Sequence, residues 1–544
     1  MKRRHIAFIS INEYDNLGVG YLSAVLSAAG FETRMIGLDR DNADILKILK
    51  KLDPLLVGFS VIFQYHIDLF KDIIVYLRRK GINCHFTAGG HYASLKYQEL
   101  LEYIPSLDSI VRFEGEYALL ELVNCLKTDT DWKQIESISY MDNGKIMTNR
   151  LRPLERDLDK FPFPTRAPLK KFVFEKKIAT IIAGRGCIHN CSFCNLRAFY
   201  SQPPGPIKRL RKPEMVVKEM KYLDTKKNCS IFFFLDDDFP LRSAREPDWV
   251  IRFCNELDEN NLTGKIMWKI CCRPDEVNKE LFKMMKNHGL FQVFLGIEDG
   301  TDTGLKRLNK HMTIKESLEG IKTLRELEIE FDYGFMLFQP WTTYRSLNEN
   351  LDFLRQVCSD GYTPVTFLKL MPYYETKVEK ELLKEGRLKV TTGIRDYDFK
   401  EDSLNQYYDF IINCFKEWLR HPEGVANISK WGRDYYSIYT HYFGKDADAI
   451  KLKRNFTKVL SDSNFYILNI LKELSVIFKS GQYKSNMSDY LNDFKEKTWL
   501  KHQSFRNRIQ NNLYKLLDLP LRHFFSKLYP ESPINLDSNY IIRS

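Results

Sequence analysis

Apolar and polar positions alternate in blocks along the first 125 residues. Short apolar runs that end at polar or glycine residues predict buried strands at 6–11, 55–62, 84–90 and 109–116. Between these runs, apolar residues recur at helical spacing and predict helices at 18–31, at 67–81 and from Tyr117 onward. Strands separated by helices of this length are typical of βαβ units, so the expected fold is α/β with a parallel Rossmann-like (flavodoxin-like) sheet.

Residues 131–177 interrupt this alternation. The stretch ISYMDNGKIMTNR predicts a β-hairpin whose turn is Asp142-Asn143-Gly144. The stretch LDKFPFPTRAPL that follows is punctuated by prolines, which predicts an irregular linker.

The strand and helix signals restart near residue 178. Six strand candidates follow one another at 179–184, 231–238, 266–272, 291–298, 331–338 and 365–372. Six βα units predict a partial (β/α)6 TIM-type barrel, in which reacting residues lie at the carboxyl ends of the strands. After about residue 396 the pattern is mainly helical, and the aromatic stretch at 430–444 is interpreted as helix core. The expected domains are 1–130, 131–177, 178–395 and 396–544.

The composition is typical of a soluble globular chain, with 544 residues, 44% hydrophobic and 28% charged. The net charge of +11 is interpreted as solvated surface, with an acidic substrate or nucleic acid as the alternative. No apolar run reaches the roughly 18 residues of a membrane span, and the N-terminus lacks a signal-peptide pattern. A cytoplasmic location is therefore expected, where clustered cysteines more often bind metals than form disulfides.

Three of the 11 cysteines lie within GRGCIHNCSFCN, at Cys187, Cys191 and Cys194. Thiolates favour zinc or iron–sulfur clusters, and structural zinc sites usually have four ligands. The adjacent pair Cys271-Cys272 could supply a fourth, but neighbouring strand residues point to opposite faces. Three thiolates would instead leave one iron of a [4Fe–4S] cluster open to a substrate or cofactor.

The segment CIHNCSFC resembles the Cys-x3-Cys-x-aromatic-Cys signature of radical S-adenosylmethionine (SAM) enzymes, with Phe193 at the aromatic position. The resemblance implies that the open iron binds the amino and carboxylate groups of SAM. It also implies that an electron from the cluster cleaves SAM into methionine and a 5′-deoxyadenosyl radical, which abstracts hydrogen from the substrate.

Other strand ends resemble the same family more loosely. The resemblance assigns to SAM binding the residues Phe193, Asp236, Asp237, Arg273, Gly296 and Glu298. Gly334 fits a further position of the pattern. Asp236 and its neighbours have two other interpretations, a divalent-cation site or a helix cap, and Glu298 could be a solvated loop residue.

Residues 5–390 resemble the cobalamin-binding radical SAM enzymes, in which a Rossmann-like domain precedes the barrel. The resemblance assigns to cobalamin binding the residues Asp15, Leu17, Gly20, Ser60, Gly89, Gly90, Glu114 and Gly115. Leu17 stands where methionine-synthase-type domains have a cobalt-ligating histidine, so cobalamin is expected to bind without a histidine from this motif. His66 follows a strand and His91 follows the glycine pair, so either could lie near the site and replace that ligand, but both are interpreted as surface or loop residues.

Two alternatives remain for the N-terminal domain. It could bind a dinucleotide, although the Gly-x-Gly-x-x-Gly fingerprint is absent, or it could have lost its cofactor. A methylthiolating enzyme acting on transfer RNA is disfavoured, because the N-terminal domain has only Cys84 and Cys125 for a second cluster. An iron–sulfur sensor module is likewise disfavoured.

The resemblance implies a cobalamin-dependent C-methyltransferase that acts on an unactivated carbon of a small-molecule or peptide natural-product intermediate. The alternatives are ring contraction, cyclisation or oxidation, or a radical SAM enzyme with a vestigial cobalamin domain. The expected cofactors are a [4Fe–4S] cluster, SAM and cobalamin. The expected partner is an external electron donor of the flavodoxin or ferredoxin type, with neither membrane insertion nor nucleic-acid binding.

Replacement of Cys191 by alanine is expected to abolish SAM cleavage, because two thiolates cannot hold the cluster. The measurement is the 5′-deoxyadenosine formed by anaerobically reconstituted protein, with about four irons per chain expected in the wild type. Retained cleavage in the variant would contradict the cluster assignment.

Overall fold

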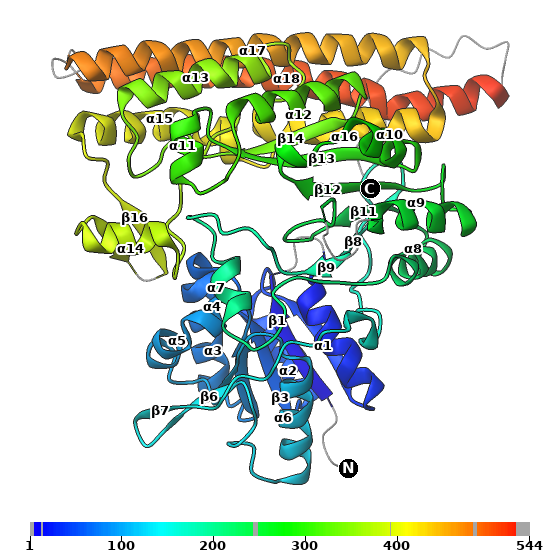
Figure 1. The fold of residues 1–544 in the computed structure, drawn as a ribbon, viewed down its shortest axis with the longest axis vertical. Helices are drawn as coiled ribbons and strands as arrows, with labels where there is room; N and C mark the ends of the chain where they lie inside the picture. Colours follow the sequence, from blue (N-terminus) through cyan, green and yellow to red (C-terminus); the bar gives the residue numbers. More distant parts are fainter. Residues whose placement is uncertain (1–4, 12–14, 243–247, 392, 482–486, 529–544) are drawn as a thin grey trace. The chain divides into compact units, whose positions relative to one another are not determined.

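The computed structural model describes residues 5–11, 15–242, 248–391, 393–481 and 487–528 (Figure 1). The chain divides into two compact units: Met1–Phe353 with Phe367–Gln406, and Leu354–Thr366 with Tyr407–Ser544. The first unit holds both large sheets, and the second is helical. The four domain boundaries inferred from sequence stay predictions, and the outermost residues of the first and last domains lie outside the described residues.

The N-terminal sheet has seven strands in the order β2-β1-β3-β4-β5-β6-β7. Its strands are β1 His5–Ser10, β2 Glu32–Gly37, β3 Leu56–Ser60, β4 His85–Gly89, β5 Ser109–Val111, β6 Ile138–Asp142 and β7 Lys145–Thr148. The first five in the chain pair in parallel, which confirms the predicted α/β sheet. The sequence pattern missed β2, because this edge strand pairs with β1 alone and its first three residues are polar or charged.

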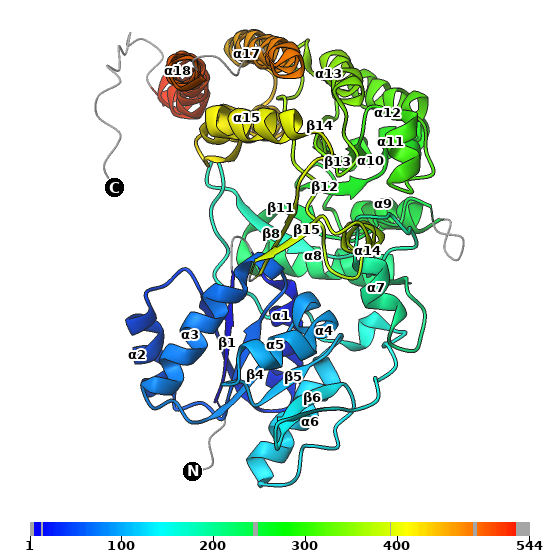
Figure 2. The same cartoon turned by 90° about the vertical axis from the view of Figure 1, so that its left-hand side faces the viewer.

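Helices cover both faces of this sheet (Figure 2). They are α1 Leu17–Ala28, α2 Asn42–Leu52, α3 Ile67–Arg79, α4 His91–Leu95, α5 Tyr97–Tyr103 and α6 Glu116–Thr128. Along β1, Ala7 and Ile9 pack into the core shared with α2 and α3, whereas Ile6 and Phe8 pack into the core shared with α1 and α6. This two-residue alternation explains why the strand is apolar throughout.

The predicted hairpin forms from β6 and β7, with Asn143 and Gly144 both at positive φ in the turn. Two successive residues of this conformation are typical of a type I′ turn, which matches the twist of the flanking strands. The hairpin pairs antiparallel with β5 through Ile110 and Ser139. It therefore extends the N-terminal sheet, whereas the sequence pattern grouped it with the linker.

The second large sheet has five parallel strands in the order β14-β13-β12-β11-β8. Its strands are β8 Lys177–Ile181, β11 Cys229–Phe234, β12 Met267–Cys272, β13 Leu290–Glu298 and β14 Glu330–Phe335. Its accompanying helices are α7 Leu196–Ser201, α8 Pro213–Lys227, α9 Trp249–Glu259, α10 Lys279–Asn287, α11 Asp302–Arg307, α12 Ile314–Glu326, α13 Tyr344–Cys358 and α14 Lys377–Lys384. Two small antiparallel pairs complete the unit: β9 Gly184–Arg185 with β10 Arg209–Leu210, and β15 Leu388–Thr391 with β16 Ile394–Tyr397.

The predicted sixth barrel strand is only partly formed. The segment 365–372 forms a single parallel bridge, between Lys369 and Phe338, which lies three residues beyond the end of β14. Pro364 and Pro372 bracket the segment, and each lacks the N–H group that a continuous ladder needs. The barrel is therefore a five-stranded parallel sheet with one extended segment at its edge.

The two faces of the barrel sheet differ. Trp268 and Ile270 on β12 and Val293 on β13 are fully buried. The intervening Lys269 is only partly buried, and Phe294, on the same strand as Val293, is 41% exposed. One face is thus closed by packing and the other is left open, which is the arrangement that a barrel with an interior site requires.

The second unit contains long helices. They are α15 Asp402–Arg420, α16 Val425–Phe443, α17 Ala447–Ser480 and α18 Met487–Leu528, of which α15 begins in the first unit. Tyr436 and Tyr439 on α16 are buried, which confirms the interpretation of the aromatic stretch as core at these two positions. Among the described residues, no helix combines the length and apolar character that crossing a bilayer would need.

A buried network of ion pairs joins the linker to both sheets of the first unit. Arg166 in the linker pairs with Asp15 at 2.5 Å and with Glu219 of α8 at 2.6 Å. Glu219 also pairs with Arg211 at 2.7 Å. All of these side chains are less than one tenth exposed, so each charge depends on its partner for compensation.

Replacement of Arg166 by methionine is expected to lower the free energy of unfolding by about 3–5 kcal/mol, because Asp15 and Glu219 lose a buried partner. The measurement is unfolding in urea, followed by circular dichroism. Arg156 lies in the same linker and is exposed, so its replacement by methionine should change the free energy by less than about 0.5 kcal/mol. Equal stability of the two variants would contradict this role for Arg166.

Candidate cofactor sites

The loop that carries the three cysteines begins where β8 ends. Gly184 and Arg185 form β9, which pairs with β10, and Gly186 follows with a φ of +86°. A side chain at Gly186 would place its Cβ 1.9 Å from the carbonyl oxygen of Ile207. Glycine is therefore required on both conformational and steric grounds, one residue before Cys187.

Two aspartates at the end of β11 hold the backbone of this loop. Asp236 accepts the N–H groups of Ala183 and Gly184 at 3.0 and 2.7 Å, and Asp237 accepts that of Gly186 at 3.2 Å. Burial raises the pKa of Asp236 to about 7 despite these hydrogen bonds. The resemblance assigned both residues to SAM, but the structure gives their carboxylates a direct role in shaping the cysteine loop.

The three thiols lie in a largely buried environment. Burial raises the pKa of Cys187 and of Cys194 to about 12, and it also raises the pKa of Cys191. The metal-free thiols are thus protonated at neutral pH, and binding of iron would displace their protons.

The spacing of the thiols also bears on the kind of metal. Among the described residues, the group whose ligand atoms are close enough to share a single ion is His189, Asp238 and Glu276. The three thiols do not form such a group. A [4Fe–4S] cluster, in which each thiolate binds a different iron, does not need the thiols to converge on a single ion.

Glu298 lies close to the cysteine loop, at the end of β13. Its carboxylate sits against two glycines, because a Cβ at Gly296 would lie 3.1 Å from Oε1 and a Cβ at Gly334 would lie 3.2 Å from Oε2. Burial raises the pKa of Glu298, while Lys310, whose Nζ is 3.9 Å away, opposes that rise. The structure therefore brings Gly296, Glu298 and Gly334 together, and it adds Lys310, which the sequence patterns missed.

The remaining residues assigned to SAM are placed differently. Arg273 is buried, and its Nε donates to Asp275 at 2.9 Å while its backbone N–H donates to Glu276 at 3.0 Å. Phe193 is partly buried within the loop, between Cys191 and Cys194. Arg273 is therefore held in place by its own turn, and its charge lies near enough to Cys191 to lower the pKa of that thiol against the effect of burial.

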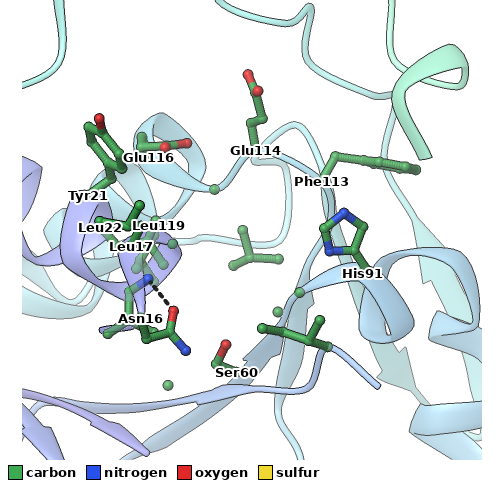
Figure 3. A pocket seen from close by; sticks show the side chains of 18 of the residues that line it. Asn16, Leu17, Tyr21, Leu22, Ser60, His91, Phe113, Glu114, Glu116 and Leu119 are labelled. Carbon is green, nitrogen blue, oxygen red and sulfur yellow. Dashed lines mark hydrogen bonds between the residues drawn. The ribbon is translucent and has the colours of Figure 1, made fainter. Parts of the chain in front are cut away.

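A cavity opens at the carboxyl ends of the N-terminal strands (Figure 3). Six of the residues assigned to cobalamin line it: Leu17, Ser60, Gly89, Gly90, Glu114 and Gly115. The barrel side of the first unit contributes Ile182, Gly184, Arg185, Phe199, Tyr200, Leu235 and Asp237. The cysteine loop and the N-terminal domain therefore share the walls of one cavity.

The inner part of this cavity is apolar. Phe8, Val19, Val111 and Leu119 line it and are almost fully buried, so it extends between the sheet and helices α1 and α6. Gly90 has a φ of +105°, and a Cβ there would lie 2.8 Å from the carbonyl oxygen of Val61. A concave and largely apolar lining with a few polar groups is typical of cofactor sites.

Two residues assigned to cobalamin do not line the cavity. Asp15 forms the buried pair with Arg166, and a Cβ on Gly20 would lie 2.7 Å from the carbonyl oxygen of Thr165. Both therefore contact the linker, and their assignment to cobalamin binding stays a prediction. The neighbouring Asn16 does line the cavity, and its Oδ1 accepts the N–H of Val19 at 3.1 Å to cap α1 (Figure 3).

Two protein-family models match the chain. The B12 binding domain matches residues 10–123, and the Radical SAM superfamily matches residues 181–354. The chain is a radical SAM enzyme with a B12-binding domain. The cofactors of the radical SAM domain are a [4Fe–4S] cluster and SAM, and the cofactor of the B12-binding domain is cobalamin.

This radical SAM enzyme is similar to proteins of known name. It is 27% identical over 387 residues to an uncharacterized methyltransferase of Pyrococcus horikoshii, a match that covers 70% of this chain and 81% of the relative. It is 28% identical over 379 residues to the anaerobic magnesium-protoporphyrin IX monomethyl ester cyclase of Cereibacter sphaeroides, which covers 66% of this chain and 60% of that enzyme.

Its fold is that of OxsB, a cobalamin-dependent S-adenosylmethionine radical enzyme whose structure contains aqua-cobalamin and S-adenosylmethionine. The two share a TM-score of 0.63 and 18% identity, over 96% of this chain and 81% of OxsB. The similarity confirms the predicted sequence of folds, with a Rossmann-like sheet, a barrel-type sheet and a helical part.

The enzyme contains a second set of buried ion pairs that sequence patterns did not reveal. Arg209 donates to both carboxylate oxygens of Glu114, at 2.7 and 2.8 Å, and Arg185 pairs with Glu116 at 2.6 Å. Burial disfavours ionisation of Glu114, but Arg185 and Arg209 outweigh it and lower the pKa of this carboxyl. Nothing in their local sequence marks these arginines, because their partners are 69 and 95 residues away.

His91 is also placed otherwise than expected. It was interpreted as a surface or loop residue, yet it lines the shared cavity and its Nε2 atom is buried. His66, at the end of the 3-10 turn Gln64–His66, does not line that cavity. The glycine pair before His91 is the signal that would have located it, since it brings the next side chain to the end of β4.

Replacement of Asp236 by alanine is expected to reduce the iron content of the enzyme, because the N–H groups of Ala183 and Gly184 lose their acceptor at about 1–3 kcal/mol each. Replacement by asparagine should preserve the cluster, since one amide oxygen can accept both groups and burial already favours a neutral side chain. The measurement is iron and sulfide per chain after reconstitution. Wild-type iron content in the alanine variant would refute this role.

Proposed function

We propose that the enzyme is a cobalamin-dependent C-methyltransferase that acts on an unactivated carbon of a small-molecule or peptide natural-product intermediate. One observation supports this most directly: the cavity assigned to cobalamin is lined by Gly184, Arg185 and Asp237, which shape the loop carrying the cluster cysteines. A methyl carrier and a source of radicals would therefore act close to one substrate.

The residues of the chain have separate tasks in this proposal. Cys187, Cys191 and Cys194 hold the cluster, which supplies the electron that cleaves SAM. Glu298 offers a carboxylate beside the loop, and the missing side chains of Gly296 and Gly334 leave room around it. The apolar inner wall of the cobalamin cavity excludes water, which protects radical chemistry from side reactions.

Cyclisation is the second candidate, because three relatives are named as cyclases, and the match to the cyclase of Cereibacter sphaeroides covers a share of this chain similar to that of the Pyrococcus horikoshii methyltransferase. Both candidates use the same two cofactor sites. They differ in whether a methyl group leaves SAM.

The proposal also includes a partner and a location. We propose that a flavodoxin or ferredoxin-type protein reduces the cluster and that the enzyme acts in the cytoplasm without binding nucleic acid. The division into 1–130, 131–177, 178–395 and 396–544 remains our proposed domain organisation.

Methyl transfer is expected to yield S-adenosylhomocysteine and 5′-deoxyadenosine in equal amounts, because one SAM gives the methyl group and another gives the radical. The measurement is chromatography of both products from reconstituted, cobalamin-loaded enzyme with substrate extract, together with the mass of the product. 5′-Deoxyadenosine formed without S-adenosylhomocysteine would favour cyclisation. Full turnover by cobalamin-free protein would refute the proposal.

A further inference from the structure

Three side chains beside the cluster cysteines bring their ligand atoms together. They are His189 in the cysteine loop, Asp238 shortly after β11, and Glu276, which ends the 3-10 turn Pro274–Glu276 after β12. One ligand atom of each residue lies within 4.8 Å of the ligand atoms of the other two. A divalent-cation site was one interpretation of the aspartate run that ends at Asp238, and the structure adds the two other residues to it.

The Nε2 atom of His189 points inward, toward the two carboxylates. It lies 3.9 Å from Oδ1 of Asp238 and 3.8 Å from Oε1 of Glu276. The side chain of His189 is 27% exposed, yet Nε2 itself is buried and has no hydrogen-bond partner among the described residues. Both separations exceed the roughly 2.7–3.2 Å of a hydrogen bond, so a proton alone does not link the ring to either carboxylate.

Each carboxylate has one oxygen committed elsewhere and one that faces the ring. Oδ2 of Asp238 pairs with Lys208 at 3.3 Å, and Oε2 of Glu276 accepts the backbone N–H of Arg273 at 3.0 Å. The side chain of Arg273 turns to Asp275 instead, to which its Nε donates at 2.9 Å. In the described part of the chain, Oδ1 and Oε1 are thus the oxygens left to face Nε2.

Two carboxylates placed so closely together need cations. The side chain of Asp238 is 11% exposed and that of Glu276 is 5% exposed, so water screens their mutual repulsion poorly. Lys208 offsets one of the two charges. A positive charge at the point where Oδ1, Oε1 and Nε2 meet would offset the other, because buried charges in proteins are paired or coordinate metals.

The ligand types and their spacing fit a divalent transition-metal ion. Such an ion binds imidazole nitrogen and carboxylate oxygen at about 2.0–2.2 Å, so two of its ligands lie at most about 4.4 Å apart. Both separations from Nε2 are within that limit. An imidazole among the ligands suits Mn²⁺ or Zn²⁺ better than Mg²⁺ or Ca²⁺, which prefer oxygen alone.

We propose that Nε2 of His189, Oδ1 of Asp238 and Oε1 of Glu276 bind a divalent transition-metal ion that is separate from the iron–sulfur cluster. The ion ties the middle of the cysteine loop to the chain segments that follow β11 and β12. Three protein ligands leave a coordination position for water or for an oxygen of a bound molecule. The inference goes beyond the proposed function and does not depend on methyl transfer.

The test uses Mn²⁺ as the probe, added to full-length enzyme whose cluster is reconstituted and kept oxidised. Mn²⁺ prefers oxygen and nitrogen ligands to thiolates, so it does not compete with iron for the cysteines. The electron paramagnetic resonance signal of free Mn²⁺ weakens on binding and measures the bound fraction. We expect one bound Mn²⁺ per chain, with a nitrogen modulation in its pulsed spectrum that changes in protein made with ¹⁵N-labelled histidine.

Glu276→Gln is expected to weaken Mn²⁺ binding by about tenfold or more, because the amide keeps an acceptor for the N–H of Arg273 but carries no charge. His189→Ala should remove the nitrogen modulation. Glu316→Gln is the matched control, since Glu316 closes a capping box at the same helical position as Glu276 but lies outside the group of three. Its affinity for Mn²⁺ should equal that of the wild type.

Three results would overturn the inference: Mn²⁺ that stays free in the presence of the wild type, a pulsed spectrum that does not respond to ¹⁵N-histidine, or equal affinities of the wild type and Glu276→Gln. Each leaves the proposed function standing, because that function is measured by S-adenosylhomocysteine and 5′-deoxyadenosine. The isotope experiment needs no variant, so a misfolded Glu276→Gln protein would not prevent a decision.

Discussion

The ion pairs between two arginines of the barrel side and two glutamates of the B12-binding domain are the contact on which the shared cavity depends. Arg185 lies two residues before Cys187 and pairs with Glu116, while Arg209, on the partner strand of that loop, is bidentate to Glu114. All four side chains are largely buried, so loss of one partner would leave an uncompensated charge. The cysteine loop is thereby held against the shared cavity.

The two candidate cofactor sites near these ion pairs are built in the same way. Each is built at the carboxyl ends of parallel strands, where the chain must turn sharply and approach other backbone closely. Gly90 and Gly186 meet this requirement with positive φ values and with contacts that exclude a Cβ. The carboxylates of Asp236 and Asp237 then hold the cysteine loop, because they accept the backbone N–H groups of Gly184 and Gly186.

Local patterns predicted most of the fold, and their failures have physical causes. Fully buried strands such as β1 and β11 are apolar throughout and are readily recognised. The edge strand β2 was missed because only one neighbour pairs with it and its charged residues reach solvent. The sixth barrel strand was overestimated because apolar content does not reveal that prolines at its two ends interrupt the ladder.

The sequence by itself determined the kind of chemistry, because the spacing of three cysteines depends only on residues that are close along the chain. It also determined that Leu17, which cannot ligate cobalt, occupies the position of a histidine. Only the tertiary structure decided that Asp15 pairs with Arg166, that Arg185 binds Glu116, and that His91 lines the cavity. Burial and pairing between residues far apart in the chain set these roles, and no local periodicity records such contacts.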